Sequence, residues 1–211
     1  MANSLPVHVA GATTTKINAP VSRLEFYHQA NILKGPEDFS QIIYHKQPGG
    51  FAPVLKPLLP EGLALDSSVV EVEEKLGKAQ YVLKNEHQVN GHLVWFYRRD
   101  MGPYLMANQF HFFQGRLVYV ESRFIERTTT EALGQEVLHR LIRRYAGADS
   151  HENAFQDERG NRLWVEERKE VFVLHYLTGD ASLKSKFPAP SKFRRRDSAR
   201  RAHLRWLRDS A

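Results

Sequence analysis

The stretch Gly91-His-Leu-Val-Trp95 recurs as Gly160-Asn-Arg-Leu-Trp164, and this repetition decides the fold that the sequence predicts. Each copy follows a helix-like segment that ends in a glycine, Gly77 in the first case and Gly147 in the second. The two tryptophans are 69 positions apart and the two glycines 70, so the spacing persists through most of a unit. Agreement of element order and spacing indicates a duplicated structural unit. The two tryptophans should then occupy equivalent environments.

The first unit is expected over residues 61–126 and starts with a short helix. Ser68 is a suitable N-cap, an apolar face runs over 69–76, and Gly77 ends the helix. Strands are predicted at 93–98, 104–113 and 116–124. A hairpin at Gln114-Gly115 would place Phe112 opposite Leu117 and Phe110 opposite Tyr119, and His111 and Val118 on the other face.

The second unit is expected over residues 127–180. A helix capped at 128–131 runs to Tyr145 with a buried stripe of Leu133, Val137, Leu141 and Tyr145. Strands are predicted at 162–166 and 171–177. The sequence therefore predicts an α+β fold of tandem units, each a helix followed by an antiparallel meander, with the helices on one face of the sheet.

Residues 1–60 form a proline-rich N-terminal extension with short helices, since seven of the ten prolines lie there. Ser22 to Glu25 has the pattern of a capping box, and the helix after it would bury Phe26, Ala30 and Leu33. A second helix is expected to begin at Pro36. The prolines at 53, 57 and 60 favour an extended connector.

Residues 181–211 form a basic linker and helical tail. From Lys184 to Ala211 the chain has ten Lys and Arg against two Asp, whereas residues 1–183 have a net charge of −2. An arginine-rich helix can neutralise phosphates and an aromatic side chain can stack on a base. Candidate nucleic-acid-binding residues are Arg194, Arg195, Arg196, Arg200, Arg201, Arg205, Trp206 and Arg208. Docking of the tail on an acidic partner or on the body, or a solubilising role, stays open.

Residues 60–79 resemble the start of a known bacterial repeat. Leu76-Gly-Lys-Ala79 with Trp95, and more loosely Tyr145-Ala-Gly147 with Trp164, are similar to the helix-then-meander repeat of the small outer-membrane lipoprotein/β-lactamase-inhibitor-protein-like superfamily. The resemblance covers residues 60–178 and implies a non-catalytic module that binds other proteins. This chain departs from the group in having no cysteine, and so no lipobox and no disulfides.

Composition excludes several classes of protein. Without cysteine the chain has no thiolate metal site and no cysteine nucleophile. No signal peptide and no apolar stretch of about 20 residues is found, so a cytoplasmic location is expected.

No catalytic, cofactor or metal site is predicted. The histidines lack the spacing of a zinc site, and His111 and His175 alternate with apolar strand residues, as hydrogen-bonded structural imidazoles do. The carboxylates of Asp157, Glu158, Glu166, Glu167 and Glu170 are expected to be solvated, and most aromatic side chains to be core.

The leading hypothesis is a non-enzymatic protein-binding module of the inhibitor, immunity or assembly-factor type. Its candidate contact residues are Trp95, Arg98, Arg99 and Trp164, because aromatic and arginine side chains dominate protein interfaces. The alternative is a nucleic-acid-associated protein that binds RNA or DNA through the tail. A hydrolase with a site assembled from loops is the third hypothesis.

Overall fold

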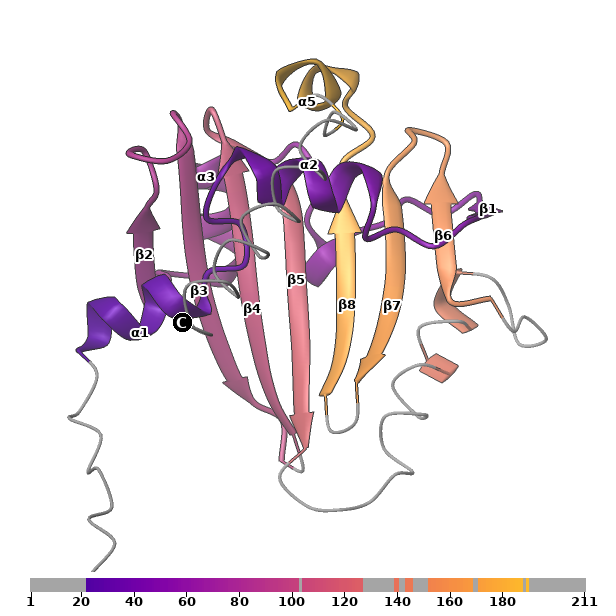
Figure 1. The fold of residues 1–211 in the computed structure, drawn as a ribbon. Helices are drawn as coiled ribbons and strands as arrows, with labels where there is room; N and C mark the ends of the chain where they lie inside the picture. The colour runs from indigo at the N-terminus through magenta and orange to yellow at the C-terminus, as the bar shows by residue number, and fades with distance from the viewer. Residues whose placement is uncertain are drawn as a thin grey trace, which may run out of the picture.

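One eight-stranded mixed sheet, with helices packed on it, forms the centre of the molecule in this computed structural model (Figure 1). The structure describes residues 22–102, 104–126, 139–140, 143–145, 152–168, 171–187 and 189. The strand order is β1-β6-β7-β8-β5-β4-β3-β2. The expectation of an α+β fold is confirmed at this level. The strands are β1 (Ala52–Val54), β2 (Tyr81–Lys84), β3 (His92–Asp100), β4 (Tyr104–Phe113), β5 (Arg116–Glu126), β6 (Ala154–Asp157), β7 (Arg162–Arg168) and β8 (Val171–Leu177).

Two antiparallel meanders meet at the centre of this sheet. Strands β2 to β5 form the first and β6 to β8 the second, and the two join where β5 pairs antiparallel with β8. The short strand β1 adds to the far edge by pairing in parallel with β6. Parts of the N-terminal 60 residues are thus built into the same sheet.

Helices cover both faces of the sheet: those of the N-terminal extension lie opposite α3 (Val69–Leu76), whereas Tyr145 of the helix predicted for the second unit packs in the same cluster as Val72 of α3. Figure 1 shows α1 (Arg23–Ala30) and α2 (Pro36–Tyr44) in front of the sheet and α3 behind it. The buried side chains agree: Val72 of α3 packs with Trp95 and Phe110, whereas Phe39 of α2 packs with Tyr119 and Trp164. Helix α5 (Ala181–Lys186) adds Leu183 to the α2 side. The sheet is apolar on both faces and needs cover on each.

The local signals in the first unit are confirmed. Ser68 caps α3 with a capping box to Glu71, and Gly77 ends the helix with a φ of +77°. The hairpin turns at Gln114 and Gly115, and Phe112 lies opposite Leu117 as predicted. A register shift after this pair then places Val120 opposite Phe110 and Tyr119 opposite His111. Because a bulge adds one residue to a strand, it moved Tyr119 to the face away from Phe110.

Three strands and one helix face were missed. The segments that form β1, β2 and β6 are only three or four residues long, too short for a pattern to be counted. Ser22 caps α1 as expected, but Tyr27 is its buried side chain and Phe26 is 41% exposed. Tyr27 stacks on Tyr81 of β2 at 4.1 Å, which fixes the helix on the edge of the sheet.

The two tryptophans of the repeated pentapeptide do not occupy equivalent positions. Trp95 lies on β3, three strands from β8, and faces α3, whereas Trp164 lies on β7 and faces α2. The position on β7 that continues the row of Trp95 across the sheet is Leu163. What the two copies share is the turn, since Gly91 and Gly160 have φ values of +75° and +77°. The repetition therefore records similar turns, and not the same place in the core.

The helix predicted over 128–145 lies largely outside the described residues, and so do Leu133, Val137 and Leu141. Residues 143–145 are helical, and Tyr145 is buried against Phe155, as expected of the stripe. Within the part of the chain that the structure describes, no helix is both long enough and apolar enough to cross a bilayer.

Candidate functional site

Arg98 and Arg99 lie at the exposed end of β3 and point to opposite sides of the sheet edge. The Arg98 guanidinium lies over the ring of Phe26 at 4.8 Å, and Arg99 pairs with Glu61 at 3.3 Å. Both arginines are exposed, Arg99 with 56% of its side chain. The structure therefore places these two predicted contact residues where a partner can reach them. Phe26 was predicted to be buried, and only the tertiary structure brings it beside Arg98.

A cleft of about 200 Å³ opens beside these arginines. It lies between the end of α3 and the ends of β3 and β4, and its charged lining is Lys78, Arg98 and Arg99 against Glu61 alone. The uncharged lining is Leu76, Gln80, Tyr97 and Asn108. The cleft thus has an excess of positive charge, and its uncharged lining combines one leucine and one tyrosine with two amides.

Two side chains in this cleft have polar groups in unusual surroundings: the Tyr97 hydroxyl, which burial keeps protonated, and the Asn108 amide oxygen, which accepts no hydrogen bond among the described residues. Tyr97 donates a hydrogen bond to the Gly77 carbonyl at 2.8 Å, and burial, followed by the charge of Glu73, raises its pKa to about 12. Asn108 is 4% exposed, and its Oδ1 has no hydrogen-bond partner among the described residues. A buried amide oxygen without a donor is uncommon, because its desolvation is uncompensated. The cleft therefore offers an acceptor to a ligand as well as cations.

Trp95 and Trp164 do not lie on an accessible surface, which corrects the prediction that they contact a partner. Their exposed fractions are 6% and 3%. Trp95 packs against Phe112 at 5.2 Å, and Trp164 stacks on His175 at 4.8 Å. Both side chains face inward because strand alternation directs them onto helix-covered faces.

A row of buried polar side chains crosses the face of the sheet that α2 covers. Asn85 contacts His92 Nδ1 at 3.0 Å, and His92 Nε2 contacts His111 Nδ1 at 3.1 Å. If the Asn85 amide donates to Nδ1, then His92 must carry its proton on Nε2 and donate to His111. The Nε2 of His111 then carries a proton that has no partner within the described residues.

Burial keeps both imidazoles neutral. It lowers the pKa of His92 to about 4, and burial together with the neighbouring His92 holds the pKa of His111 well below its ordinary value. His92 is the first residue of β3 and is 1% exposed. The expectation that His111 is a structural imidazole agrees with these contacts.

The second part of the row links β5, β8 and β7. Tyr119 Oη lies 2.7 Å from His175 Nδ1, and His175 Nε2 lies 3.2 Å from Glu166. Glu121, which is 3% exposed, forms an ion pair with Arg123. Glu166 orients the imidazole so that Nδ1 can accept the Tyr119 hydroxyl, as in catalytic relays. Tyr119 is 1% exposed, however, so a substrate has no access to the hydroxyl in this structure.

The prediction that the Asp157 carboxylate is solvated is wrong. It is 5% exposed and accepts hydrogen bonds from the backbone amides of Leu58, Arg159 and Asn161. It ties the β6–β7 turn to the segment that precedes α3. Glu170 lies outside the described residues.

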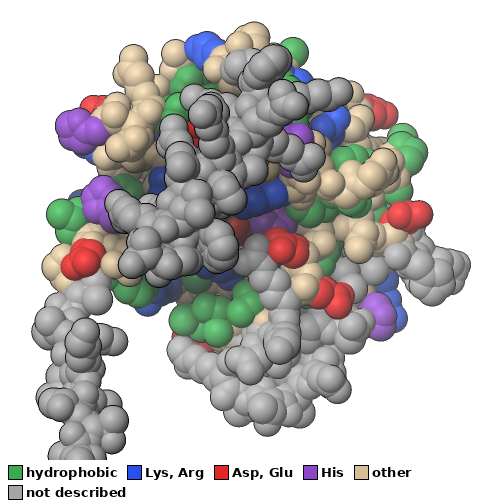
Figure 2. Space-filling view, in the orientation of Figure 1, with side chains coloured by type: hydrophobic (Ala, Val, Ile, Leu, Met, Phe, Trp, Pro, Cys, Tyr) green, Lys and Arg blue, Asp and Glu red, His purple; other side chains and the backbone are tan. Residues whose placement is uncertain are grey.

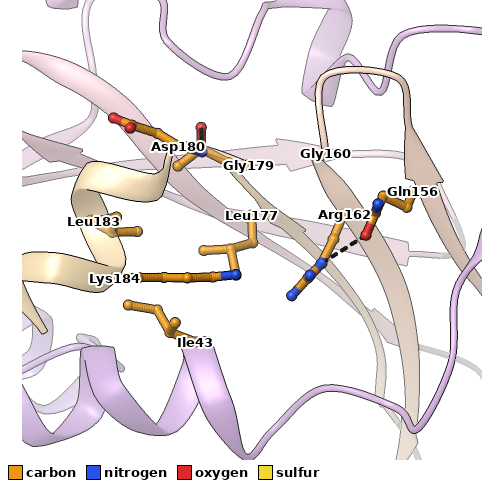
Figure 3. Close-up of a pocket in the computed structure, with 10 residues that line it drawn as sticks. Ile43, Gln156, Gly160, Arg162, Leu177, Gly179, Asp180, Leu183 and Lys184 are labelled. Carbon is orange, nitrogen blue, oxygen red and sulfur yellow. Dashed lines mark hydrogen bonds between the residues drawn. The ribbon is translucent and has the colours of Figure 1, made fainter. Parts of the chain in front are cut away.

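A second, smaller pocket lies at the other end of the molecule, between β7, the end of β8 and α5 (Figure 3). Its volume is about 100 Å³, and its cations are Arg162 and Lys184. No sequence signal marked it, because the two residues are 22 positions apart and only the docking of α5 brings them together.

The candidate nucleic-acid-binding residues from Arg194 to Arg208 lie outside the described residues. On the face shown in Figure 2, the visible Lys and Arg side chains of the described residues are interspersed with Asp and Glu. In the described part of the chain, no group of three or more His, Asp or Glu side chains is arranged to hold a metal ion. Comparisons with protein-family models, with curated proteins and with solved structures gave no match.

Proposed function

We propose that this protein is a non-enzymatic protein-binding module, of the inhibitor, immunity or assembly-factor type, and that its contact surface is the Arg98–Arg99 end of β3. We call the set formed by Phe26, Lys78, Arg98 and Arg99 the β3-end surface. The observation that carries the proposal is the cation-rich cleft of about 200 Å³ lined by Lys78, Arg98 and Arg99.

The composition of the β3-end surface supports this proposal. Interface hot spots are enriched in arginine and large aromatic side chains that pack against one another. Phe26 is 41% exposed, although a phenylalanine side chain is stabilised by burial, and the Arg98 guanidinium lies over its ring. A partner that covers this pair would bury the ring and keep the cation–π contact.

The charge of the cleft indicates the chemistry of the partner. Lys78, Arg98 and Arg99 face one carboxylate, Glu61, so an acidic side chain of a partner can enter and complete the ion pairs. Asn108 at the bottom of the cleft can accept a hydrogen bond from a backbone amide of the same segment. The expected partner segment is therefore an exposed acidic loop.

The test is quantitative affinity capture with intact protein as bait. The double variant Arg98→Ala/Arg99→Ala should lose a partner that the wild type retains. The matched control is Arg159→Ala, an exposed arginine in the β6–β7 turn at the far end of the sheet. Loss of about 2 kcal/mol or more in the double variant, as expected for anchor residues, corresponds to at least about a 30-fold weaker Kd. Equal retention by all three proteins would contradict the proposal.

A second function, binding of RNA or DNA through the tail, is favoured by the charge distribution along the chain. The ten basic residues after residue 183 contrast with a body of net charge −2. Lys184 and Phe187 belong to the folded body, since Phe187 stacks on Phe39 at 4.5 Å. A deletion that tests the tail should therefore leave Phe187 in place and remove residues 190–211.

The affinity of the intact chain for single-stranded RNA and duplex DNA should fall steeply with salt, because bound phosphates release counterions. The shortened chain should lose this binding and keep the unfolding temperature of the wild type. Unchanged binding after the deletion would exclude the tail as the nucleic-acid site.

A further inference from the structure

Two cationic side chains meet without a counterion in the pocket between β7 and α5. Figure 3 shows the Lys184 amino group directed toward the guanidinium of Arg162. Arg162 Nε donates to Gln156 at 3.0 Å and its Nη1 donates to Gln47 at 2.6 Å, so its bonds go to neutral amides. Among the described residues neither Arg162 nor Lys184 forms an ion pair with a carboxylate.

Among the residues that line this pocket, the carboxylate is that of Asp180, and its hydrogen bonds go to Ser182. Asp180 caps α5 by accepting from the Ser182 amide at 2.8 Å and from the Ser182 hydroxyl at 2.7 Å. Figure 3 shows its carboxylate turned away from Lys184 and Arg162. The pocket therefore keeps two positive charges.

The walls of the pocket are fixed by the fold. A side chain at Gly179 would collide with the carbonyl of Arg159 and the backbone of Gly160, so the two turns touch directly. The Asn161 side chain stabilises this contact, because its Oδ1 accepts a hydrogen bond from the Gly179 amide at 2.9 Å. Tyr44 of α2 donates to the Lys184 carbonyl at 3.3 Å, which holds α5 in place. A site with positioned groups needs little reorganisation when a ligand binds.

We propose that this pocket binds a phosphate group, either free or at the end of a small phosphorylated ligand. A phosphate near neutral pH carries close to two negative charges, which match Arg162 and Lys184. Arginine offers a planar pair of donors and lysine a point charge, the combination that holds phosphate oxygens. The Thr178 hydroxyl, which accepts from the Asp180 amide at 3.3 Å, has its own proton to donate.

The size and lining of the pocket suit one such group. A volume of about 100 Å³ has room for a single tetrahedral oxyanion. Ile43, Leu177 and Leu183 form the apolar part of the wall. The site is separate from the β3-end surface and does not depend on the proposed protein partner.

The test is isothermal titration of the full chain with inorganic phosphate, at constant ionic strength set with sodium chloride. Wild type and Lys186→Gln should bind phosphate with the same Kd. Lys184→Gln should weaken binding at least about tenfold, as expected when a hydrogen bond to a charged group worth about 1.5 kcal/mol is lost. Lys186 is the matched control, because it lies on the same helix but donates to Gln114 at 2.7 Å. Circular dichroism checks that the variants are folded.

A second variant, Arg162→Lys, keeps the charge but removes the planar donor pair, and it should also weaken binding. Titrations with O-phosphoserine and with acetate identify the source and the class of ligand. Binding of O-phosphoserine at least as tight as inorganic phosphate supports a phosphorylated small molecule, and weaker binding supports free phosphate. The proposal is overturned if the wild type binds no phosphate, if Lys184→Gln binds like Lys186→Gln, or if acetate binds as well as phosphate.

Discussion

Moderate acid should destabilise this protein well above the pH at which its carboxylates titrate, because two neutral imidazoles are buried side by side. His92 and His111 are 1% and 0% exposed, their rings stack at 5.4 Å, and they share a hydrogen bond. A proton added to either ring would place a charge in a dry site beside a second imidazole. We therefore expect the fold to resist protonation of this pair.

The magnitude follows from the pKa of His92, about 4 in the folded protein against 6.5 for an ordinary imidazole. Between these two values the unfolded chain takes up a proton and the folded chain does not, so the free energy of unfolding falls as the pH falls. At pH 5 the loss is about 2 kcal/mol for His92. His111 shifts in the same direction, so the total loss exceeds that of His92 alone.

Urea unfolding at pH 7.0, 6.0 and 5.0 measures this loss. This pH range lies above the ordinary pKa of Asp and Glu side chains. The pKa values of Glu71 and Asp180 are lowered from their ordinary values, so these two carboxylates do not contribute to the loss measured here. His92→Gln keeps polar atoms near Asn85 and His111 but removes one titrating group, so its stability should depend less steeply on pH. His87→Gln, at an exposed position, is the control and should keep the wild-type slope. The reasoning is refuted if the wild type is equally stable at pH 7 and pH 5, or if His92→Gln has the wild-type slope.

Two further changes test the local structure. Ser68→Ala should lower the free energy of unfolding by about 1 kcal/mol in urea titrations, because it removes the hydroxyl that accepts from the Glu71 amide and donates to the Glu71 carboxylate at the start of α3; no change would mean that the cap is replaced by water. Gly179→Ala should lower it by about 1–3 kcal/mol, since the added methyl overlaps the Arg159 carbonyl. Gly35→Ala is the control, because a methyl group added there contacts no other atom. An equal loss of stability in the two variants would show that the Gly179 turn can move away from the Arg159–Gly160 turn without cost.

Elements with a strong local pattern were predictable. Helix α3 was found at its observed bounds because its cap, its apolar face and its terminating glycine all lie within ten residues. Strands β4 and β8 were found at their bounds because each is long and apolar. Strands β1 and β6 had no comparable pattern, since they are short and depend on pairing with each other.

The candidate sites were only partly predictable. Arg98 and Arg99 stood out as a charged pair at a strand end, but Phe26 joins them only because α1 docks on β2 through Tyr27 and Tyr81. Trp95 and Trp164 were misassigned as partner contacts because helices cover both faces of the sheet, so an aromatic side chain on either face is buried.

By itself the sequence determined the α+β class, most of the longer strands, the caps of α1 and α3 and the separation of charge between body and tail, because these depend on neighbouring residues along the chain. The tertiary structure alone decided how the two meanders join at β5 and β8, that helices cover both faces, and where His92, His111 and the pocket of Arg162 and Lys184 come together. Contacts between residues far apart in the chain are fixed by the packing of complementary apolar surfaces, and no local pattern encodes that packing.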